Sequence, residues 1–583
     1  MLHGDVSVEL GRRVATALKT ALDVDITPAE ALVRPSNRSG TDYQCDVAMS
    51  LGKRLGRAPR EVATDIVTHL DAGDLVETSE IAGPGFINLV LQRTWLEQHA
   101  TALLGDDRLG VARTERPRRF AIDYSSPNVA KEMHVGHLRS SIIGDAIARL
   151  LRFEGHEVVP HNHLGDWGTP FGMLIEHLVD EGWTAAAGHD GHTISDLNGF
   201  YQEARKKFDA DPDFATRARG RVVLLQGGDE QTLALWQQLV DESTRHFDKV
   251  YELLGIDLTH EDIHGESFYN PYLAEVIDEL EAKELTEISD GAVCVFPPGF
   301  TNRDGDRLPL IIRKSDGGYG YATTDLATVR YWTRERGVTD LLYVVGTPQA
   351  QHFAMIFTAS RQAGWLTNEH RAEHIGFGSI LGEDGKTIRT RAGGSVKLVE
   401  LLTEAIDRAA AIVADRSELG DEERHAVARA VGIGAVKYAD LSGDRERDYT
   451  FDWDRMLAMD GNTAVYLQYA NARILSVLRK AGEAPAPGTP VTLVEAAERD
   501  LLLKLLQLPA AVTSATETYL PHRLCTYLYE TATAFTAFYE RCPILADTTP
   551  EDLRRSRLVL AQLTSKVLTL GLSLLGIGTP QRL

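Results

Sequence analysis

From residue 119 onward, short apolar runs alternate with stretches of helical periodicity, and this alternation limits the possible fold more than any other feature. The run LLYVVG is almost entirely apolar, which is typical of a strand buried in a parallel sheet. Strands are predicted at 120–124, 157–164, 341–346 and 374–381, and helices at 136–152 and 351–364. This succession of strands and helices predicts a Rossmann-like, doubly wound parallel sheet.

The segments around this sheet have different patterns. Residues 1–112 combine helical periodicity with the alternating run FINLVL, and we expect a small α+β domain there. The sheet domain is expected over 113–397, with an insertion at about 185–310 where the strand–helix rhythm is lost. Residues 398–583 are helical in period and predict an all-α C-terminal domain. The predicted fold class is therefore a multidomain α/β protein.

Charge and composition exclude several classes of protein. The net charge of −23, from 61 basic and 84 acidic residues, argues against a protein that coats nucleic acid. The N-terminal segment contains Asp5 and Glu9 and lacks a secretory pattern, and no apolar run approaches the ~18 residues of a membrane span. The four cysteines form no CxxC pair. We expect a cytoplasmic protein that binds neither a membrane nor DNA.

Two histidines, His134 and His137, lie between the first predicted strand and the helix that follows it. The free N–H groups and the positive dipole at the start of such a helix suit a phosphate. Gly136 lets a ligand approach the backbone, and the imidazoles add donors that can stabilise charge developing in a transition state. Ser140 and Asp145 are expected on the face of this helix that points away from its apolar side.

A metal site is the alternative use of these histidines. His161 and His163, at the end of the next predicted strand, could supply further ligands. No cysteine and no HExxH pattern accompanies them, so the sequence favours phosphate over zinc. We expect no metal ion held by the protein itself.

The segment SSPNVAKEMHVGHLRS at 125–140 resembles the HIGH signature of class I aminoacyl-tRNA synthetases, in the form found in arginyl-tRNA synthetases. Further segments resemble that family in the same order: GDWGTPFGML, YGYATTDLA, LLYVVGTPQAQHF, GKTIRTRAGGSVKL, YADLSGDRERDYTFDWDRML, YLQYANARI and LLGIGTPQRL. The N-terminal AGPGFINLVL resembles the family's additional N-terminal domain. The resemblance covers nearly the whole chain.

The resemblance implies a set of residues that act on ATP, which arrives with Mg²⁺. These are His134, His137 and Lys131 as catalytic residues, and Gly136, Lys386 and Arg391 as ATP-binding residues. Most class I enzymes have a KMSKS loop, whereas this chain has KTIRTRAGG. Many arginyl enzymes depart similarly, and the lysine upstream of HIGH, here Lys131, is thought to compensate. A solvated basic loop is the alternative interpretation of the KTIRTRAGG segment.

The resemblance also implies an arginine pocket. Its residues are Asp123, Asn128, Tyr321, Asp325 and Gln349. A planar guanidinium binds carboxylates in bidentate geometry, the role implied for Asp123 and Asp325 with Tyr321 beside them. Asn128 and Gln349 are implied to hold the α-amino and carboxylate end of arginine. The alternative is that Asp325 caps a helix and Asp123 merely ends a strand.

One residue departs from the family pattern within GDWGTPFG. We expect a glutamine where Pro170 stands. The proline changes the freedom of the backbone beside Trp167 and removes the amide from any role in the pocket. The segment that resembles the ATP signature is not affected.

The terminal domains are implied to contact tRNA. The resemblance makes residues 1–112 a tRNA-contacting domain and 398–583 a connector with an anticodon-binding domain. Tyr466, Tyr469 and Asn471 are the implied tRNA-binding residues, because aromatic side chains stack on splayed single-stranded bases. Core packing is the alternative role for one of the two tyrosines.

Taken together, these features imply an enzyme, an arginine–tRNA ligase that attaches L-arginine to tRNA(Arg) through arginyl-adenylate for protein synthesis. ATP is consumed, and AMP and diphosphate are released. We expect a monomer whose partners are tRNA(Arg) and L-arginine. Two alternatives stay open: a paralog with altered amino-acid or inhibitor selectivity, and a non-catalytic tRNA-binding protein.

Overall fold

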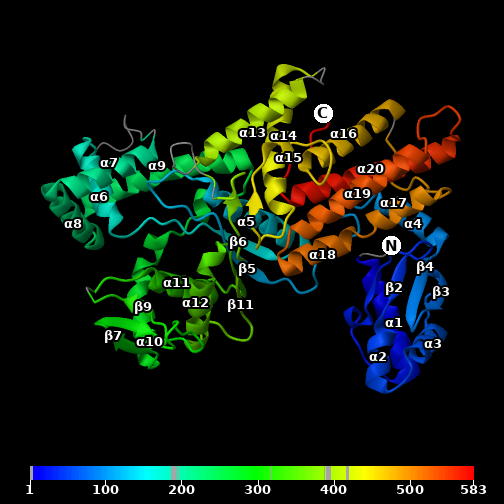
Figure 1. The fold of residues 1–583 in the computed structure, drawn as a ribbon, viewed down its shortest axis with the longest axis horizontal. Helices are drawn as coiled ribbons and strands as arrows, with labels where there is room; N and C mark the ends of the chain where they lie inside the picture. Colours follow the sequence, from blue (N-terminus) through cyan, green and yellow to red (C-terminus); the bar gives the residue numbers. More distant parts are fainter. Residues whose placement is uncertain are drawn as a thin grey trace. The chain divides into compact units, whose positions relative to one another are not determined.

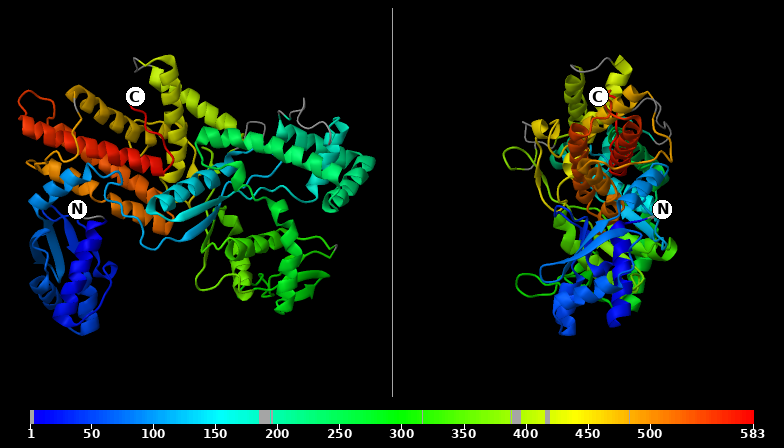
Figure 2. Two further views of the ribbon diagram at one scale, coloured as in Figure 1. Left: turned by 180° about the vertical axis from the view of Figure 1, so that it is seen from behind. Right: turned by 90° about the vertical axis from the view of Figure 1, so that its right-hand side faces the viewer.

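The computed structural model divides the chain into two compact units, which are described separately below. It describes residues 4–184, 194, 196–315, 317–386, 388, 396–414, 419–482 and 484–583. Unit 1 comprises Met1–Thr114, Arg416–Val431 and Ala458–Leu583, and unit 2 comprises Glu115–Asp415 and Gly432–Leu457. In the described part of the chain, no helix combines the length and apolar character needed to cross a membrane. Figures 1 and 2 show the elements of each unit.

Unit 2 contains the strands and helices that surround the predicted site. Its first part contains β5 (Arg119–Asp123), α5 (Val135–Glu154), β6 (Glu157–His161), α6 (Pro170–Asp180), α7 (Leu197–Ala210), α8 (Pro212–Gln226), α9 (Glu230–Leu254), η2 (His260–Asp262), η3 (Glu266–Tyr272) and α10 (Leu273–Ala282). Its second part contains β7 (Thr286–Ser289), β8 (Ala292–Val295), β9 (Leu310–Arg313), α11 (Tyr321–Arg330), the π-helix η4 (Tyr331–Glu335), β10 (Asp340–Tyr343), η5 (Thr347–Gln349), α12 (Ala350–Gln362), β11 (Arg371–His374), β12 (Ile380–Leu381), α13 (Leu398–Ala414), β13 (Tyr449–Thr450) and α15 (Trp453–Met456).

A four-stranded parallel sheet in the order β11-β10-β5-β6 forms the centre of unit 2, which confirms the predicted fold class. The chain passes from β5 to β6 on one side and later returns to β10 on the other side of β5. Asp123 ends β5 and pairs with His161 of β6 and Tyr343 of β10. The carboxyl ends of β5 and β10 therefore meet where the strand order reverses, which is where α/β sheets bind ligands.

Helix α5 follows β5 and is buried on almost every side. The expectation that Ser140 and Asp145 face away from the core is wrong, because both side chains are buried. Ser140 Oγ donates to the carbonyl of Val344 (2.7 Å), and Asp145 Oδ2 accepts from Arg149 Nε (2.8 Å). Because these polar groups find partners inside the unit, their burial is not penalised as that of unpaired groups would be.

The strand predicted at 374–381 is misplaced. The fourth sheet strand is β11, which ends at His374, and the later β12 pairs instead with β13. A Cβ on Gly378 would lie 2.6 Å from the carbonyl carbon of Arg447, so the chain passes close to a neighbouring loop here rather than continuing in the sheet. Strand β13 also interrupts the region that was predicted to be entirely helical.

The predicted insertion at about 185–310 contributes to two substructures of unit 2, which also include the neighbouring helices α6 and α11 (Figure 1). Helices α6, α7, α8 and α9 pack on one another, and β7, β8 and β9 form an antiparallel sheet that shares a core with α10 and α11. Pro170 is the first residue of α6, a position whose N–H needs no helical partner. The departure from glutamine is therefore compatible with the local fold.

Unit 1 combines a small α+β domain with a helical domain. The first contains α1 (Val6–Leu22), η1 (Ala29–Ala31), β1 (Val33–Pro35), β2 (Tyr43–Cys45), α2 (Val47–Leu55), α3 (Pro59–His69), β3 (Val76–Ala82), β4 (Phe86–Leu91) and α4 (Arg93–Leu103), with the antiparallel order β1-β2-β4-β3. The second contains α16 (Ala464–Ala481), α17 (Ala496–Leu505), α18 (Leu508–Thr518), α19 (His522–Arg541) and α20 (Glu551–Leu574). Helix α14 (Asp421–Leu441) has residues in both units.

Candidate active site

The loop between β5 and α5 is held in an unusual backbone conformation. Ser125, Ser126 and Ala130 have φ values of 71°, 46° and 62°, in the left-handed region that non-glycine residues seldom adopt. Their N–H groups donate respectively to Ser140 Oγ (2.9 Å), Asn162 Oδ1 (3.1 Å) and Ser243 Oγ (3.0 Å). These hydrogen bonds offset the backbone strain and fix the loop that contains Asn128 and Lys131.

The two histidines cap α5. His134 is the N-cap residue, and its Nδ1 accepts a hydrogen bond from the N–H of Gly136 (3.0 Å). His137 Nδ1 accepts from the N–H of His134 (3.1 Å), and the ring centroids are 4.1 Å apart. Since an imidazole nitrogen that accepts a hydrogen bond carries no proton, each neutral ring has its proton on Nε2. Both rings therefore present an Nε2–H donor.

The surroundings keep both imidazoles neutral. Burial and, secondarily, the ammonium of Lys131 lower the pKa of His134. Burial lowers the pKa of His137 to about 4, with His134 as a further cause. At pH 7 the positive character of this site therefore comes from Lys131 and from the N-terminus of α5, while the histidines act as uncharged donors.

Gly136 is required by the geometry of the cap. A Cβ at this position would lie 2.8 Å from His134 Cε1 and 2.9 Å from its Nδ1. The residue is exposed, so an anion can approach the start of α5 without meeting a side chain, while the N–H groups of Val135 and Gly136 already donate to Val396 and His134. Because glycine has no side chain, the His134 ring can pack against the backbone here and a ligand can approach the helix.

The remaining residues predicted to bind ATP lie on two loops. Lys131 is exposed, and its ammonium lies 4.7 Å from the ring centroid of Tyr201 in α7. Lys386 is exposed in a turn where its N–H donates to Asp384 Oδ1 (3.0 Å) and its carbonyl accepts from the N–H of Gly382 (2.7 Å). Arg391 lies outside the described residues.

Near the carboxyl edge of the sheet, Asp325 acts electrostatically on two other carboxyl groups, Asp123 and Glu266. Asp123 is 8% exposed and accepts from Ser126 Oγ (2.7 Å), and burial raises its pKa to about 6. Burial also raises the pKa of Glu266 to about 7. Asp325 raises the pKa of both groups further by repulsion between like charges. A cation placed beside them would favour the ionised forms of Asp123 and Glu266.

The other predicted arginine-binding residues surround this group in different ways. Asp325 Oδ2 lies 2.6 Å from His352 Nε2, and the Tyr321 ring packs on that imidazole at 4.9 Å. Asn128 and Gln349 are both exposed, the first in the loop after β5 and the second at the start of α12. Asp325 therefore has a hydrogen-bond partner already, while Tyr321, 68% exposed, is available to a ligand.

Glu266 was not predicted from the sequence. It begins η3 within the insertion, where an acid looks like an ordinary helix-start residue. Its separation from the sheet strands in the sequence hides this role, because only the fold places it where Asp166 and Asp325 raise its pKa.

The residues predicted to contact tRNA differ in accessibility. Tyr469 is 37% exposed, and Tyr466 is half-buried with its ring 5.8 Å from that of Tyr529. Asn471 is 1% exposed; its Oδ1 accepts from Ser565 Oγ (2.7 Å). The Asn471 side chain thus joins α16 to α20 in the core, and only the tyrosines have surface to offer an RNA.

The zinc alternative finds no support in the described residues, where no three His, Cys, Asp or Glu side chains are grouped to hold a metal ion. His161 is buried, with Nε2 at 3.2 Å from both the carbonyl of His264 and the hydroxyl of Tyr269. Its environment is that of a structural histidine.

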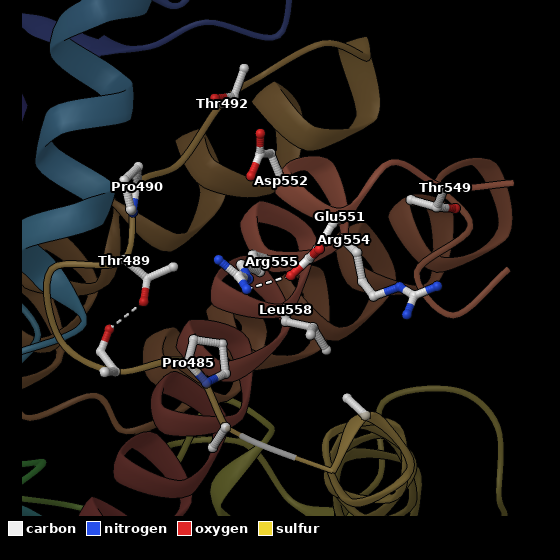
Figure 3. A pocket seen from close by; sticks show the side chains of 13 residues that line it. Pro485, Thr489, Pro490, Thr492, Thr549, Glu551, Asp552, Arg554, Arg555 and Leu558 are labelled. Atoms are coloured by element: carbon white, nitrogen blue, oxygen red, sulfur yellow. Dashed lines mark hydrogen bonds and ion pairs between the residues drawn. The ribbon is translucent and has the colours of Figure 1, made fainter. Parts of the chain in front are cut away.

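Unit 1 contains a cavity of about 960 Å³ between the loop after α16 and the start of α20 (Figure 3). Its lining mixes Arg554 and Arg555 with Glu551 and Asp552, and Arg555 is paired with Glu551. Because opposite charges alternate there, the cavity has no clear preference for an anion or a cation, and we assign it no part in the chemistry.

Comparison with known proteins agrees with the geometry of unit 2. The family model for the catalytic domain of class I (R) tRNA synthetases matches residues 99–453. The parallel sheet and the histidine-capped helix thus define a class I aminoacyl-tRNA synthetase.

Further matches are more specific. The models for the arginyl-tRNA synthetase N-terminal domain and the DALR anticodon-binding domain match residues 9–91 and 467–583. The arginine–tRNA ligase of Thermobifida fusca is 52% identical over 582 residues, covering 99% of this chain and 100% of that protein. The chain belongs to the arginyl-tRNA synthetase family, as the sequence motifs predicted.

Solved structures of that family have the same fold. The arginyl-tRNA synthetase of Plasmodium falciparum superposes with a TM-score of 0.86 at 29% identity and full coverage of both chains. The Thermus thermophilus enzyme gives a TM-score of 0.81 at 25% identity, covering 99% of this chain and 100% of the other.

The carboxyl group cluster leads to a prediction about titration. We expect Glu266 to titrate near pH 7 and Asp123 near pH 6 in the ligand-free protein, and Asp325→Asn to lower both pKa values because it removes a negative charge. Carbon NMR of carboxyl-labelled protein between pH 4 and 8 measures this. Asp290→Asn, the same change in an exposed turn, is the control. Equal titration curves in wild type and Asp325→Asn would contradict the arrangement.

Proposed function

We propose that this chain attaches L-arginine to tRNA(Arg) for protein synthesis, using ATP and passing through arginyl-adenylate. The observation that carries the proposal is the pairing of two opposite environments in unit 2. The N-terminus of α5 offers neutral donors and a cation, which suit ATP, while Asp123, Asp325 and Glu266 form an acidic group, which suits a guanidinium. Family membership supports the same reaction.

In the first step, a carboxylate oxygen of arginine forms a bond to the α-phosphorus of ATP, and the bond to diphosphate breaks. We assign His134 and His137 the role of donating from Nε2 to phosphate oxygens as charge develops. Lys131 would neutralise phosphate charge, and Gly136, which has no side chain, would leave room for a phosphate beside the start of α5. Lys386 and Arg391 are proposed to assist from the second loop, and Mg²⁺ enters with ATP as part of that substrate.

The arginine side chain is proposed to lie among the acidic residues. Asp123 and Asp325 would accept from the guanidinium, and Tyr321 would pack beside it. Asn128 and Gln349 would hold the α-amino and carboxylate end. We add Glu266 to this set on the basis of its electrostatic coupling to Asp325.

In the second step, the 2′-hydroxyl of the terminal tRNA adenosine takes the arginyl group, and AMP leaves. No protein nucleophile is needed, so catalysis rests on positioning and charge neutralisation. We propose that residues 1–112 and 398–583 bind tRNA, with Tyr466 and Tyr469 stacking on bases. We further propose that the enzyme is a cytoplasmic monomer.

Aminoacylation of total tRNA with each of the twenty amino acids tests the function. Arginine alone should be attached, and the reaction should depend on ATP. Attachment of a different amino acid would indicate a paralog with altered selectivity. Tight binding of tRNA without any attachment would indicate a non-catalytic tRNA-binding protein and would overturn the proposal.

Asp325→Asn tests the arginine pocket. The amide keeps the shape and can still bond His352 but cannot balance a guanidinium, and losing a charged hydrogen bond costs about 1.5–3 kcal/mol. We expect kcat/KM for arginine to fall by about 10- to 100-fold, with Asp290→Asn unchanged. Arginine kinetics of Asp325→Asn equal to wild type would remove Asp325 from the pocket.

A further inference from the structure

Lys397 lies beside the histidine motif and is joined to it by backbone hydrogen bonds. The N–H of Val135 donates to the carbonyl of Val396 (3.1 Å), and the N–H of Leu398 donates to the carbonyl of Met133 (2.9 Å). Lys397 and His134 are thereby paired as in an antiparallel ladder. The backbone around Lys397 is fixed directly to the first residues of the helix cap.

The side chain of Lys397 joins two further segments. Its ammonium lies 2.9 Å from Glu132 Oε2 and 3.4 Å from Asp196 Oδ1. Glu132 is in the loop before α5, and Asp196 is the N-cap residue of α7 in the inserted helices. The Glu132 side chain is 14% exposed and that of Lys397 35%, so this ion pair is partly shielded from water.

The start of α7 in turn contacts the residues that precede the histidines. Asn198 Oδ1 accepts from the N–H of Glu132 (3.2 Å), and the ammonium of Lys131 lies over the Tyr201 ring in a cation–π contact. Lys131 acts electrostatically on both His134 and His137. The position of α7 therefore affects where the positive charge of Lys131 lies relative to the imidazoles.

We propose that Lys397 is a positioning residue for adenylate formation, because its ammonium holds Glu132 and Asp196 together and so places Lys131 beside the histidines. It acts through these neighbours and not by contact with the reacting atoms. The inference rests on the proposed function, since it concerns how ATP is held in that reaction. It also gives the inserted helices a part in arranging the ATP site.

The variants Lys397→Met, Lys397→Arg, Asp196→Asn and Glu132→Gln test the proposal in ATP–diphosphate exchange and arginylation assays, with tRNA(Arg) present. The concentration of active enzyme is measured by single-turnover formation of adenylate. Arg307→Met is the control, because Arg307 also forms an ion pair, at 2.6 Å with Glu287 of β7, and lies outside the segments assigned to ATP, arginine or tRNA.

Lys397→Met should raise the KM for ATP about three- to tenfold, as expected for the loss of two partly exposed ion pairs, and leave the KM for arginine unchanged. Lys397→Arg should restore most of the ATP affinity. Asp196→Asn and Glu132→Gln should each give part of the effect, and Lys397→Met combined with Asp196→Asn should be no worse than Lys397→Met alone. Arg307→Met should match wild type.

Three results would overturn the positioning role. The first is an unchanged KM for ATP in Lys397→Met when the wild type is active. The second is a defect in Lys397→Met with wild-type kinetics in both carboxylate variants, which would mean that Lys397 touches ATP itself. The third is a Lys397→Met variant with a lower melting temperature and a smaller fraction of active enzyme but an unchanged KM for ATP, together with a Lys397→Arg variant that restores neither property. If the wild type forms no arginyl-tRNA at all, the proposed function fails instead.

Discussion

The capping of α5 by two imidazoles is the interaction on which the rest of the site depends. Because each Nδ1 accepts from the backbone, both rings are fixed in orientation and in the position of the proton. Burial keeps them neutral, so the helix can begin at the sheet edge without an acidic cap that would repel phosphate. A serine or aspartate would cap the helix equally well but could not provide the same donors.

The body of α5 is fixed by charged groups that the core encloses. Arg139 Nε lies 3.3 Å from Asp440 Oδ1, and Lys437 donates to the carbonyl of Leu254 (2.9 Å) and lies 3.7 Å from Asp145 Oδ2. Any other rotation of the helix would leave a buried charge without its partner, which is strongly unfavourable. These pairs therefore favour the one orientation that directs the histidines to the ligand edge of the sheet.

The two ends of the site have opposite electrostatic character, and this matches the two small substrates. In the proposed function, anionic ATP would meet a helix N-terminus with Lys131 close by, and cationic arginine would meet Asp123 and Glu266, whose pKa values Asp325 raises. Binding of a guanidinium would relieve the repulsion that Asp325 exerts on the other two acids, so the proposed pocket would draw specificity and affinity from the same carboxyl groups.

The sequence alone was sufficient for the local elements, since β5, α5 and the histidine pair follow from periodicity and from strand–loop–helix order. The predictions from the sequence were wrong where contacts between distant segments determine whether a side chain is buried. Asp145 looks like a surface residue of α5 but is buried because Lys437, nearly 300 positions later in the chain, lies beside it. Glu266 and Asn471 show the same limit. The pKa of Glu266 is raised by burial and by acids distant in the sequence, and Asn471 accepts a hydrogen bond from Ser565 in the core, and no spacing pattern predicts either feature.

The protonation state of His137 tests this account most directly. Nitrogen NMR of histidine-labelled protein, assigned with a His137→Asn variant, reports both ring nitrogens. The account predicts a neutral ring at pH 7 with the proton on Nε2, and a ring that stays neutral down to about pH 5 because its pKa is about 4. A charged imidazolium at pH 7, or a proton on Nδ1, would contradict the proposed cap and the donor role built on it.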